Sequence, residues 1–154
     1  MTAQFIHLRV SSEYSISRGL LRINEIVANA EKLSMPAVAL TDLSNMFGMV
    51  KFFKQAEAAG IKPISGTILN LISPDANEGE ILCLAKNNEG LKSLMKLISL
   101  AQLQQKKGKV LISFEQLSSA YEDIIVISGG SRSNIFNLFK QKKIKELKDE
   151  LIQF

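Results

Sequence analysis

The stretch MPAVALTDLSNMFGMVKFFKQAEAAGIKPISG, residues 35–66, contains two strand patterns separated by a helix pattern. AVALTD (residues 37–42) is a short, nearly uninterrupted apolar run, which is typical of a buried parallel strand. Apolar side chains recur at helical spacing over residues 49–59, and Gly60 is placed to cap the end of that helix. KPISGTILNLI (Lys62–Ile72) follows as the next strand. This order predicts a βα unit and a mainly parallel sheet.

The segments on either side continue the alternation of strand and helix. Toward the N-terminus we expect a first strand at residues 5–10 and a helix over residues 23–33 that Pro36 ends. Toward the C-terminus the patterns predict a polar loop at 73–80, strands at 81–86 and 123–128, a capping box at Ser113 and Gln116, and helices at 88–104, 134–140 and 142–152. Roughly five strands are too few to close an eight-strand barrel of about 250 residues. We therefore expect an incomplete α/β barrel.

Composition bounds the class of protein. The chain has 154 residues, of which 46% are hydrophobic and 22% charged, and this balance argues against disorder. Cys83 is the only cysteine, so no internal disulfide can form. The net charge of +4 permits a polyanionic partner without requiring one. The sequence has neither the layout of a secretion signal nor an apolar run of about 20 residues, so we expect no membrane contact and a cytoplasmic location.

Three segments carry a resemblance to a known family. They are HLRVSSEYS (residues 7–15), the stretch at 35–66, and LAKNNEGLKSLMKLISLAQL (residues 84–103) with the following VISGG (residues 126–130). In order and spacing they resemble the opening of bacterial DNA polymerase III alpha subunits, which is a PHP domain. The resemblance implies a PHP-type distorted (β/α) barrel. It also implies that residues 1–154 are the N-terminal part of that domain, with the polymerase palm, fingers and later domains absent.

The resemblance places metal ligands at four positions of this sequence. Active PHP domains read like HLHVHSEYS in the first strand, LTDHGN after the second and GCEVYV in the third. This sequence has Arg9 and Ser11 at the second and third histidines of the first motif. Leu43 stands at the histidine of LTDHGN, and Ile68 stands at the glutamate of GCEVYV. Only the hydroxyl of Ser11 remains as a weak donor to a metal.

Side-chain chemistry then argues against a metal. A catalytic zinc site needs about three ligands from His, Cys, Asp and Glu, and hydrocarbon side chains have no lone pair. The guanidinium of Arg9 is always charged and accepts no hydrogen bond, so it would repel a divalent cation. We expect no cofactor in this chain and no phosphoesterase activity. The alternative is a metal-dependent PHP phosphoesterase or exonuclease with the atypical ligands His7, Glu13, Asp42 and Asp75.

Some residues have a functional and a structural interpretation. We expect His7 and Asp42 to belong to a vestigial pocket, with His7 hydrogen-bonded at the barrel mouth and Asp42 structural, either paired with Arg9 or capping a helix. The loop SGGSRSN (residues 128–134) could hold a phosphate, but it lacks the lysine of a P-loop, so a tight turn is favoured. The lysines of residues 142–150 could contact DNA phosphates. They alternate with acids at i,i+4 spacing, so a solvated helix face is favoured, with Lys142–Glu146 and Lys145–Asp149 as the expected pairs.

The resemblance implies that the chain functions as a structural scaffold. The parent protein resembles a DNA-directed DNA polymerase, a nucleotidyltransferase of chromosomal DNA replication, and this chain lacks the polymerase active site. In relatives with degenerate sites the PHP region supports the polymerase and docks the proofreading exonuclease subunit. Implied partners are that subunit, other replicase subunits, and DNA through the parent polymerase. Because an incomplete barrel exposes an open strand edge, we also expect the isolated chain to self-associate or to be marginally stable.

Overall fold

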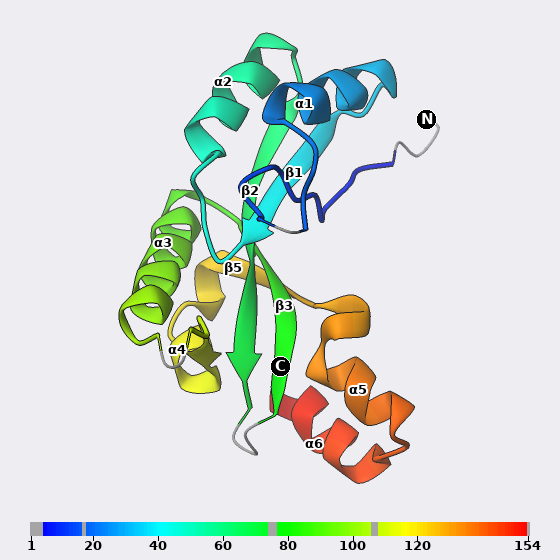
Figure 1. Ribbon diagram of the computed structural model, residues 1–154, viewed down its shortest axis with the longest axis vertical. Coiled ribbons are helices and arrows are strands. Elements are labelled where there is room, and N and C mark those ends of the chain that lie inside the picture. The colour runs from blue at the N-terminus through cyan, green and yellow to red at the C-terminus, as the bar shows by residue number, and fades with distance from the viewer. Residues whose placement is uncertain (1–4, 17, 74–76, 106–107, 154) are drawn as a thin grey trace.

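A mixed five-stranded sheet organises the chain. The computed structural model describes residues 5–16, 18–73, 77–105 and 108–153. The strands are β1 (Ala37–Leu43), β2 (Lys62–Ile72), β3 (Glu78–Ala85), β4 (Ile112–Ser113) and β5 (Ile124–Ser128). Their order is β1-β2-β3-β5, and β4 pairs with the last residues of β2. Figure 1 shows the long β2 and β3 running through the middle of the molecule.

The sheet contains both parallel and antiparallel pairs, and a short connection sets the direction of β3. β1 and β4 both run parallel to β2, whereas β3 is antiparallel to β2 and to β5. Four strands therefore share one direction, as the mainly parallel pattern predicts, and β3 alone runs the other way. Only residues 73–77 separate β2 from β3. A parallel crossover needs about a dozen residues or more, so this connection is a hairpin.

Helices cover the sheet in two groups. α1 (Ile23–Lys32) and α2 (Met49–Ala58) pack with β1 around the fully buried Phe52. α3 (Asn88–Leu103) and α4 (Phe114–Ser118) pack on β2, β3 and β5 in a second apolar cluster. The short 3₁₀ turns at Tyr121–Asp123 and Gly130–Arg132 precede and follow β5, and α5 (Asn134–Lys140) and α6 (Ile144–Gln153) complete the chain. Figure 1 shows α5 and α6 across the β2–β3 hairpin from α3.

The predicted first strand at residues 5–10 is wrong as a regular element. This segment is extended beside β1 but is not a strand. The carbonyl oxygens of His7 and Val10 accept from Ala39 N at 2.9 Å and from Thr41 N at 2.8 Å. The acceptors are three residues apart and the donors two, so the ladder cannot stay in register. The hydroxyl of Thr41 instead accepts from Val10 N at 2.9 Å.

Two predicted caps are confirmed. Gly60 follows the end of α2 with φ of +69°, the left-handed conformation that ends many helices. At α4, Ser113 Oγ accepts from Gln116 N at 3.2 Å, and Gln116 Oε1 accepts from Ser113 N at 2.9 Å. This reciprocal pair is the predicted capping box. No helix in the described part of the chain is long and apolar enough to cross a membrane.

Cys83 tests how tightly the core is closed. Its side chain lies in the cluster beneath α3, and burial raises the pKa of the thiol from 9.0 to about 12. A disulfide reagent such as Ellman's reagent attacks the thiolate. At pH 8 we expect the native chain to react far more slowly than the chain in guanidinium chloride. Because the folded pKa is raised, the contribution of this thiol to stability is complete below pH 9 and is lost toward pH 12.

Equal reaction rates in the native and the denatured chain would contradict this packing. The denatured sample is the control, since it shows that the thiol is reduced and reactive.

Candidate functional site

The two aliphatic residues at ligand positions lie side by side. Leu43 and Ile68 are register partners in the parallel ladder of β1 and β2. The row continues across the sheet, because Ile68 pairs with Leu82 of β3 and Leu82 pairs with Ile127 of β5. All four belong to the apolar cluster on the sheet face opposite the α3 cluster. Hydrocarbon therefore fills the place where the resemblance puts a histidine and a glutamate.

Arg9 forms an ion pair at the same end of the sheet. Its Nη2 donates to Glu80 Oε2 over 2.7 Å, and its Nη1 donates to the carbonyl oxygen of Gly129 over 2.6 Å. Ser11, the other ligand position of that segment, has its Oγ 3.5 Å from the carbonyl oxygen of Thr41. Both ligand positions of the N-terminal segment thus face hydrogen-bond acceptors of the chain itself.

Asp42 is a structural acceptor. It is 1% exposed. Its Oδ1 accepts from Ser12 N at 2.7 Å and from Ser15 Oγ at 2.6 Å, and its Oδ2 accepts from Ser12 Oγ at 2.7 Å. The hypothesis of an Asp42–Arg9 ion pair is wrong, because Arg9 pairs with Glu80 instead. Asp42 fixes the N-terminal segment against the end of β1. Its role is therefore structural, as we expected, but its partners are Ser12 and Ser15 and not Arg9.

His7 lies apart from these groups. The side chain is exposed, and its ring contacts Phe5 edge to face with 4.8 Å between ring centroids. In the described part of the chain the imidazole makes no hydrogen bond, so the predicted hydrogen-bonded histidine is wrong. Solvation explains the difference, since an exposed imidazole bonds to water and needs no protein partner.

The described members of the atypical ligand set, His7, Glu13 and Asp42, do not come together as a site. Glu13 lies 3.7 Å from the Arg22 guanidinium and 3.8 Å from the Lys51 ammonium, so lysine and arginine already balance its charge. Asp75 lies outside the described residues. Among residues 5–16, 18–73, 77–105 and 108–153, no three His, Cys, Asp or Glu side chains are grouped to hold a metal ion. The residues at the ligand positions, a guanidinium, a hydroxyl and two hydrocarbons, do not fit a divalent cation.

Sequence reasoning missed Glu80, the buried acid at the C-terminal ends of the parallel strands β1, β2 and β5. We call this end of the sheet the mouth. Glu80 is 4% exposed and lies near the start of β3, opposite Asn70 of β2. The sequence pattern instead predicts that it ends a polar loop at residues 73–80. A signal was present, because Glu80, Leu82 and Leu84 alternate and must share one face of a strand. The partners Arg18 and Arg132 come from segments far apart in the sequence, so no local pattern could have found them.

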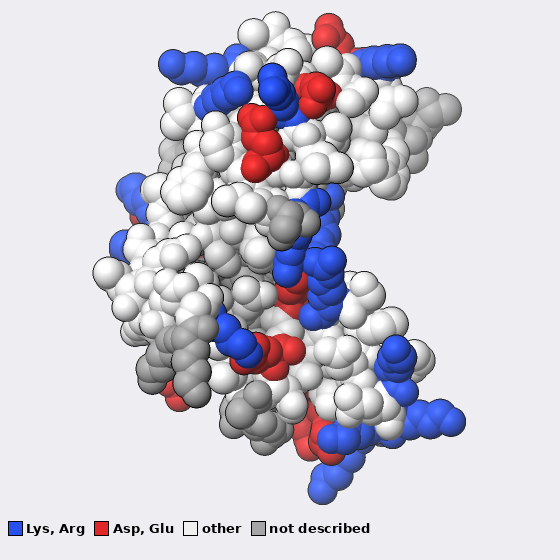
Figure 2. All heavy atoms as spheres, in the orientation of Figure 1, with Lys and Arg blue, Asp and Glu red and all other residues white. Residues whose placement is uncertain are grey.

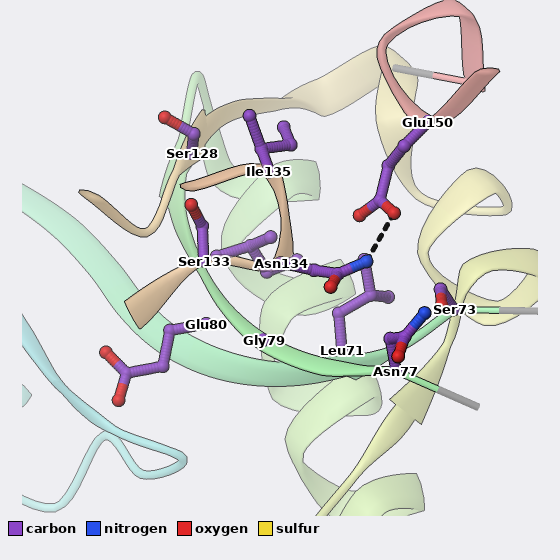
Figure 3. A pocket seen from close by; sticks show the side chains of 11 residues that line it. Leu71, Ser73, Asn77, Gly79, Glu80, Ser128, Ser133, Asn134, Ile135 and Glu150 are labelled. Atoms are coloured by element: carbon purple, nitrogen blue, oxygen red, sulfur yellow. Dashed lines mark hydrogen bonds between the residues drawn. The ribbon is translucent and has the colours of Figure 1, made fainter. Parts of the chain in front are cut away.

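The loop after β5 forms a tight turn. Ser133 Oγ accepts from Phe136 N at 3.1 Å and donates to the carbonyl oxygen of Gly130 at 2.7 Å. The hydroxyl therefore caps the seven-residue α5. Figure 3 shows Asn134 pointing toward Glu150 of α6, to which its amide donates, while the carboxylate of Glu80 points away from both.

The basic C-terminal helix has a solvated face. Lys143 of this region pairs with Glu146 at 3.0 Å, three residues away. Of the two expected pairs, Lys142–Glu146 and Lys145–Asp149, the described residues form neither. Lys142 adopts a positive φ of 58° just before α6, which takes it out of helical phase with Glu146.

Ser44, directly after Leu43, is held in an unfavourable conformation. Its φ is +50°, a region that favours glycine, and it stands at the glycine of the LTDHGN pattern. The residue is 6% exposed, and its hydroxyl has no hydrogen-bond partner among the described residues. Its backbone cannot relax easily, because Ser44 N donates to the carbonyl oxygen of Ile68 at 2.8 Å.

The comparisons with known proteins agree with this geometry. The family model described as PHP domain matches residues 7–154. DNA polymerase III subunit alpha of Pseudomonas fluorescens is 41% identical over 138 residues, and that of Escherichia coli (strain K12) is 39% identical over 137 residues. These matches cover 88% and 86% of this chain. The subunit of Borreliella burgdorferi is 33% identical over 162 residues, which cover 99% of this chain.

The chain spans a small part of these relatives, 12% of the first and 14% of the Borreliella subunit. Among solved structures, a proposed metal-dependent phosphoesterase from Bifidobacterium adolescentis is similar, with a TM-score of 0.51 and 17% identity. The match covers 64% of this chain and 32% of that one, and at this identity it supports the fold alone.

Replacing Ser44 by glycine should stabilise the chain. In Ser44→Gly we expect the free energy of unfolding to rise by about 1 kcal/mol, because the positive φ becomes unstrained and a buried unpaired hydroxyl is removed. Glycine costs part of this gain through the greater entropy of the unfolded chain. Urea denaturation followed by circular dichroism measures the change.

Ser34→Gly is the matched control. Ser34 has a similar φ of +52° but is exposed, so this variant relieves the backbone only. We expect a smaller gain there. A loss of stability in Ser44→Gly, or a gain no larger than that of Ser34→Gly, would contradict the account of the buried hydroxyl.

Proposed function

Because this chain belongs to the PHP domain family, we propose that it is the non-catalytic PHP region of a DNA polymerase III alpha subunit that replicates a bacterial chromosome. One observation carries the proposal: Leu43 and Ile68 stand side by side at two ligand positions, and Arg9 at a third is paired with Glu80. Such a mouth has no donor set for a metal. Without a metal, no activated water is available for phosphoester hydrolysis.

The role that follows is mechanical. The N-terminal segment is tied to β1 through Asp42 and to β3 through Arg9 and Glu80, so the mouth is held rigidly without an ion. In the proposal this domain supports the polymerase, whose nucleotidyl transfer depends on parts of the protein outside this chain. It docks the proofreading exonuclease subunit and works beside other replicase subunits in the cytoplasm, and DNA is reached through the polymerase.

The first test is capture of the proofreading subunit. With the 154-residue chain as bait, we expect the host's purified exonuclease subunit to be retained. Two variants, Phe47→Ser and Leu103→Ser, change side chains that are 77% and 85% exposed, so neither should disturb the core. Phe47 precedes α2 and Leu103 ends α3, so loss of capture by one variant alone locates the docking surface. Failure of the wild-type chain to retain the subunit would contradict the docking role.

The second test is metal content. After dialysis against Mn²⁺ or Zn²⁺, we expect the chain to hold less than stoichiometric metal and to leave p-nitrophenyl phosphate unhydrolysed. Arg9→Ala is the informative variant, because it removes the repelling charge but restores no ligand, so it should also bind none. One equivalent of metal that disappears in His7→Ala would favour the alternative phosphoesterase with atypical ligands.

A further inference from the structure

Three arginines meet at one buried carboxylate. Arg9 Nη2 lies 2.7 Å from Glu80 Oε2. Arg18 Nη1 donates to the other oxygen, Oε1, and Arg132 Nη1 lies 3.6 Å from that same atom. The arginines come from the extended N-terminal segment, from the residues before α1 and from the turn after β5. We call these four residues the Glu80 cluster.

The charges of the Glu80 cluster do not balance. Each guanidinium carries a full positive charge at any physiological pH, and the single carboxylate neutralises one of them. Two positive charges remain within a few ångströms of each other, and their mutual repulsion is unfavourable. A structural ion pair would need one arginine, so this surplus is unexplained by folding alone.

Most N–H groups of the Glu80 cluster also form no hydrogen bond with the residues that the structure describes. A guanidinium offers five N–H donors. Arg9 donates two hydrogen bonds, to Glu80 and to Gly129, and Arg18 donates one, to Glu80. Arg132 forms an ion pair with Glu80 but no hydrogen bond with any described residue.

The arginine side chains of the cluster are partly exposed to solvent, whereas the acid is almost completely buried. The side chains of Arg9, Arg18 and Arg132 are 37%, 29% and 57% exposed, whereas that of Glu80 is 5% exposed. Figure 2 shows basic atoms gathered in the middle of the visible face, between the regions of α1 and α5, with acidic atoms beside them. An ion from solution can therefore approach the guanidinium groups directly.

The loop after β5 is built to bring Arg132 close. A Cβ atom on Gly129 would lie 2.0 Å from the carbonyl oxygen of Glu80, so only glycine allows this approach. Gly130 has a φ of +64°, and a Cβ there would lie 3.8 Å from Arg9 Nη1. The two glycines thus position the turn over Glu80 and place Arg132 on the side of the carboxylate that Arg18 also contacts.

We propose that the Glu80 cluster binds one phosphate-class oxyanion, with Glu80 holding the three guanidinium groups in place. The surplus of two charges matches a phosphate group, which carries about −1.5 to −2 at pH 7. A carboxylate would compensate one charge only. The planar fork of a guanidinium suits two phosphate oxygens at once, and such charge-assisted bonds are among the strongest in proteins. The site needs no metal and assigns no catalysis.

Isothermal titration of the 154-residue chain with inorganic phosphate tests the proposal. EDTA is present so that no metal can bridge the anion, which also separates this site from the alternative phosphoesterase. We expect saturable binding of one phosphate per chain that weakens with added NaCl, and much weaker binding of acetate. Absence of saturable binding, or equal affinity for acetate, overturns the proposal. Neither outcome bears on whether the proofreading subunit docks.

Arg132→Gln is the decisive variant. Because Arg132 makes no hydrogen bond in the described structure, its replacement should leave the thermal unfolding midpoint without phosphate unchanged, while phosphate affinity falls at least about tenfold. Lys96→Gln removes an equal charge from the exposed face of α3 and should keep wild-type affinity. Equal losses in the two variants would indicate a general effect of net charge and would overturn the site.

A single-stranded oligonucleotide distinguishes the source of the phosphate. If inorganic phosphate binds saturably and the oligonucleotide competes with it only weakly, the result supports a site for a small anion. Binding of the oligonucleotide through Arg132 without binding of inorganic phosphate would overturn the proposal in favour of a nucleic-acid contact.

Discussion

The ion pair between Arg9 and Glu80 is the constraint on which the mouth of this sheet depends. Glu80 sits near the start of β3, the one strand that runs against the others, so its carboxylate lies where β1, β2 and β5 end. Its charge is almost completely removed from solvent, and a buried carboxylate is tolerated only when it is paired and hydrogen-bonded. Arg9 and Arg18 supply those bonds, and in doing so they bring two segments of the N-terminal region onto β3.

Two kinds of contact organise this mouth, an apolar row across the sheet and a set of polar contacts beside it. Deeper in the sheet, Leu43, Ile68, Leu82 and Ile127 form a continuous apolar row, which gains from burial and needs no partner. Polar groups lie on either side of this row. Glu80 and Asn70 face each other nearer the end of β2, and Asp42, held by Ser12 and Ser15, precedes Leu43 on β1. The ends of parallel strands leave backbone groups and loops to be organised whether or not an ion is present. Ionic and hydroxyl contacts of Glu80 and Asp42 organise them here.

Local pattern was enough to predict most of the fold, and its failures have physical causes. The helix α1, the strand β2, the cap at Gly60 and the capping box at Ser113 each depend on residues within a few positions of one another, and each is confirmed. The segment at residues 5–10 has the composition of a strand, but its spacing of hydrogen bonds against β1 is irregular, and composition does not encode register. The reversal of β3 was open to prediction, since the five residues before it are too few for a crossover. The four degenerate ligand positions could be located from the resemblance, and the structure shows what fills them.

The partners of Arg9 could not be predicted from the resemblance or from local sequence pattern, because they are set by the topology of the sheet. Asp42 was a natural choice because it adjoins Leu43 and lies near a strand end, yet two serines of the N-terminal segment already donate three hydrogen bonds to its carboxylate. Glu80 pairs with Arg9 because the β2–β3 hairpin brings the start of β3 beside the ends of the parallel strands. This position follows from sheet topology and not from neighbouring residues in the sequence. Once Glu80 is there, any basic residue that the loops bring within reach is attracted to it, and Arg18 and Arg132 both arrive. A single buried acid thus recruits more positive charge than it can neutralise, and this imbalance is the basis of the proposed anion site.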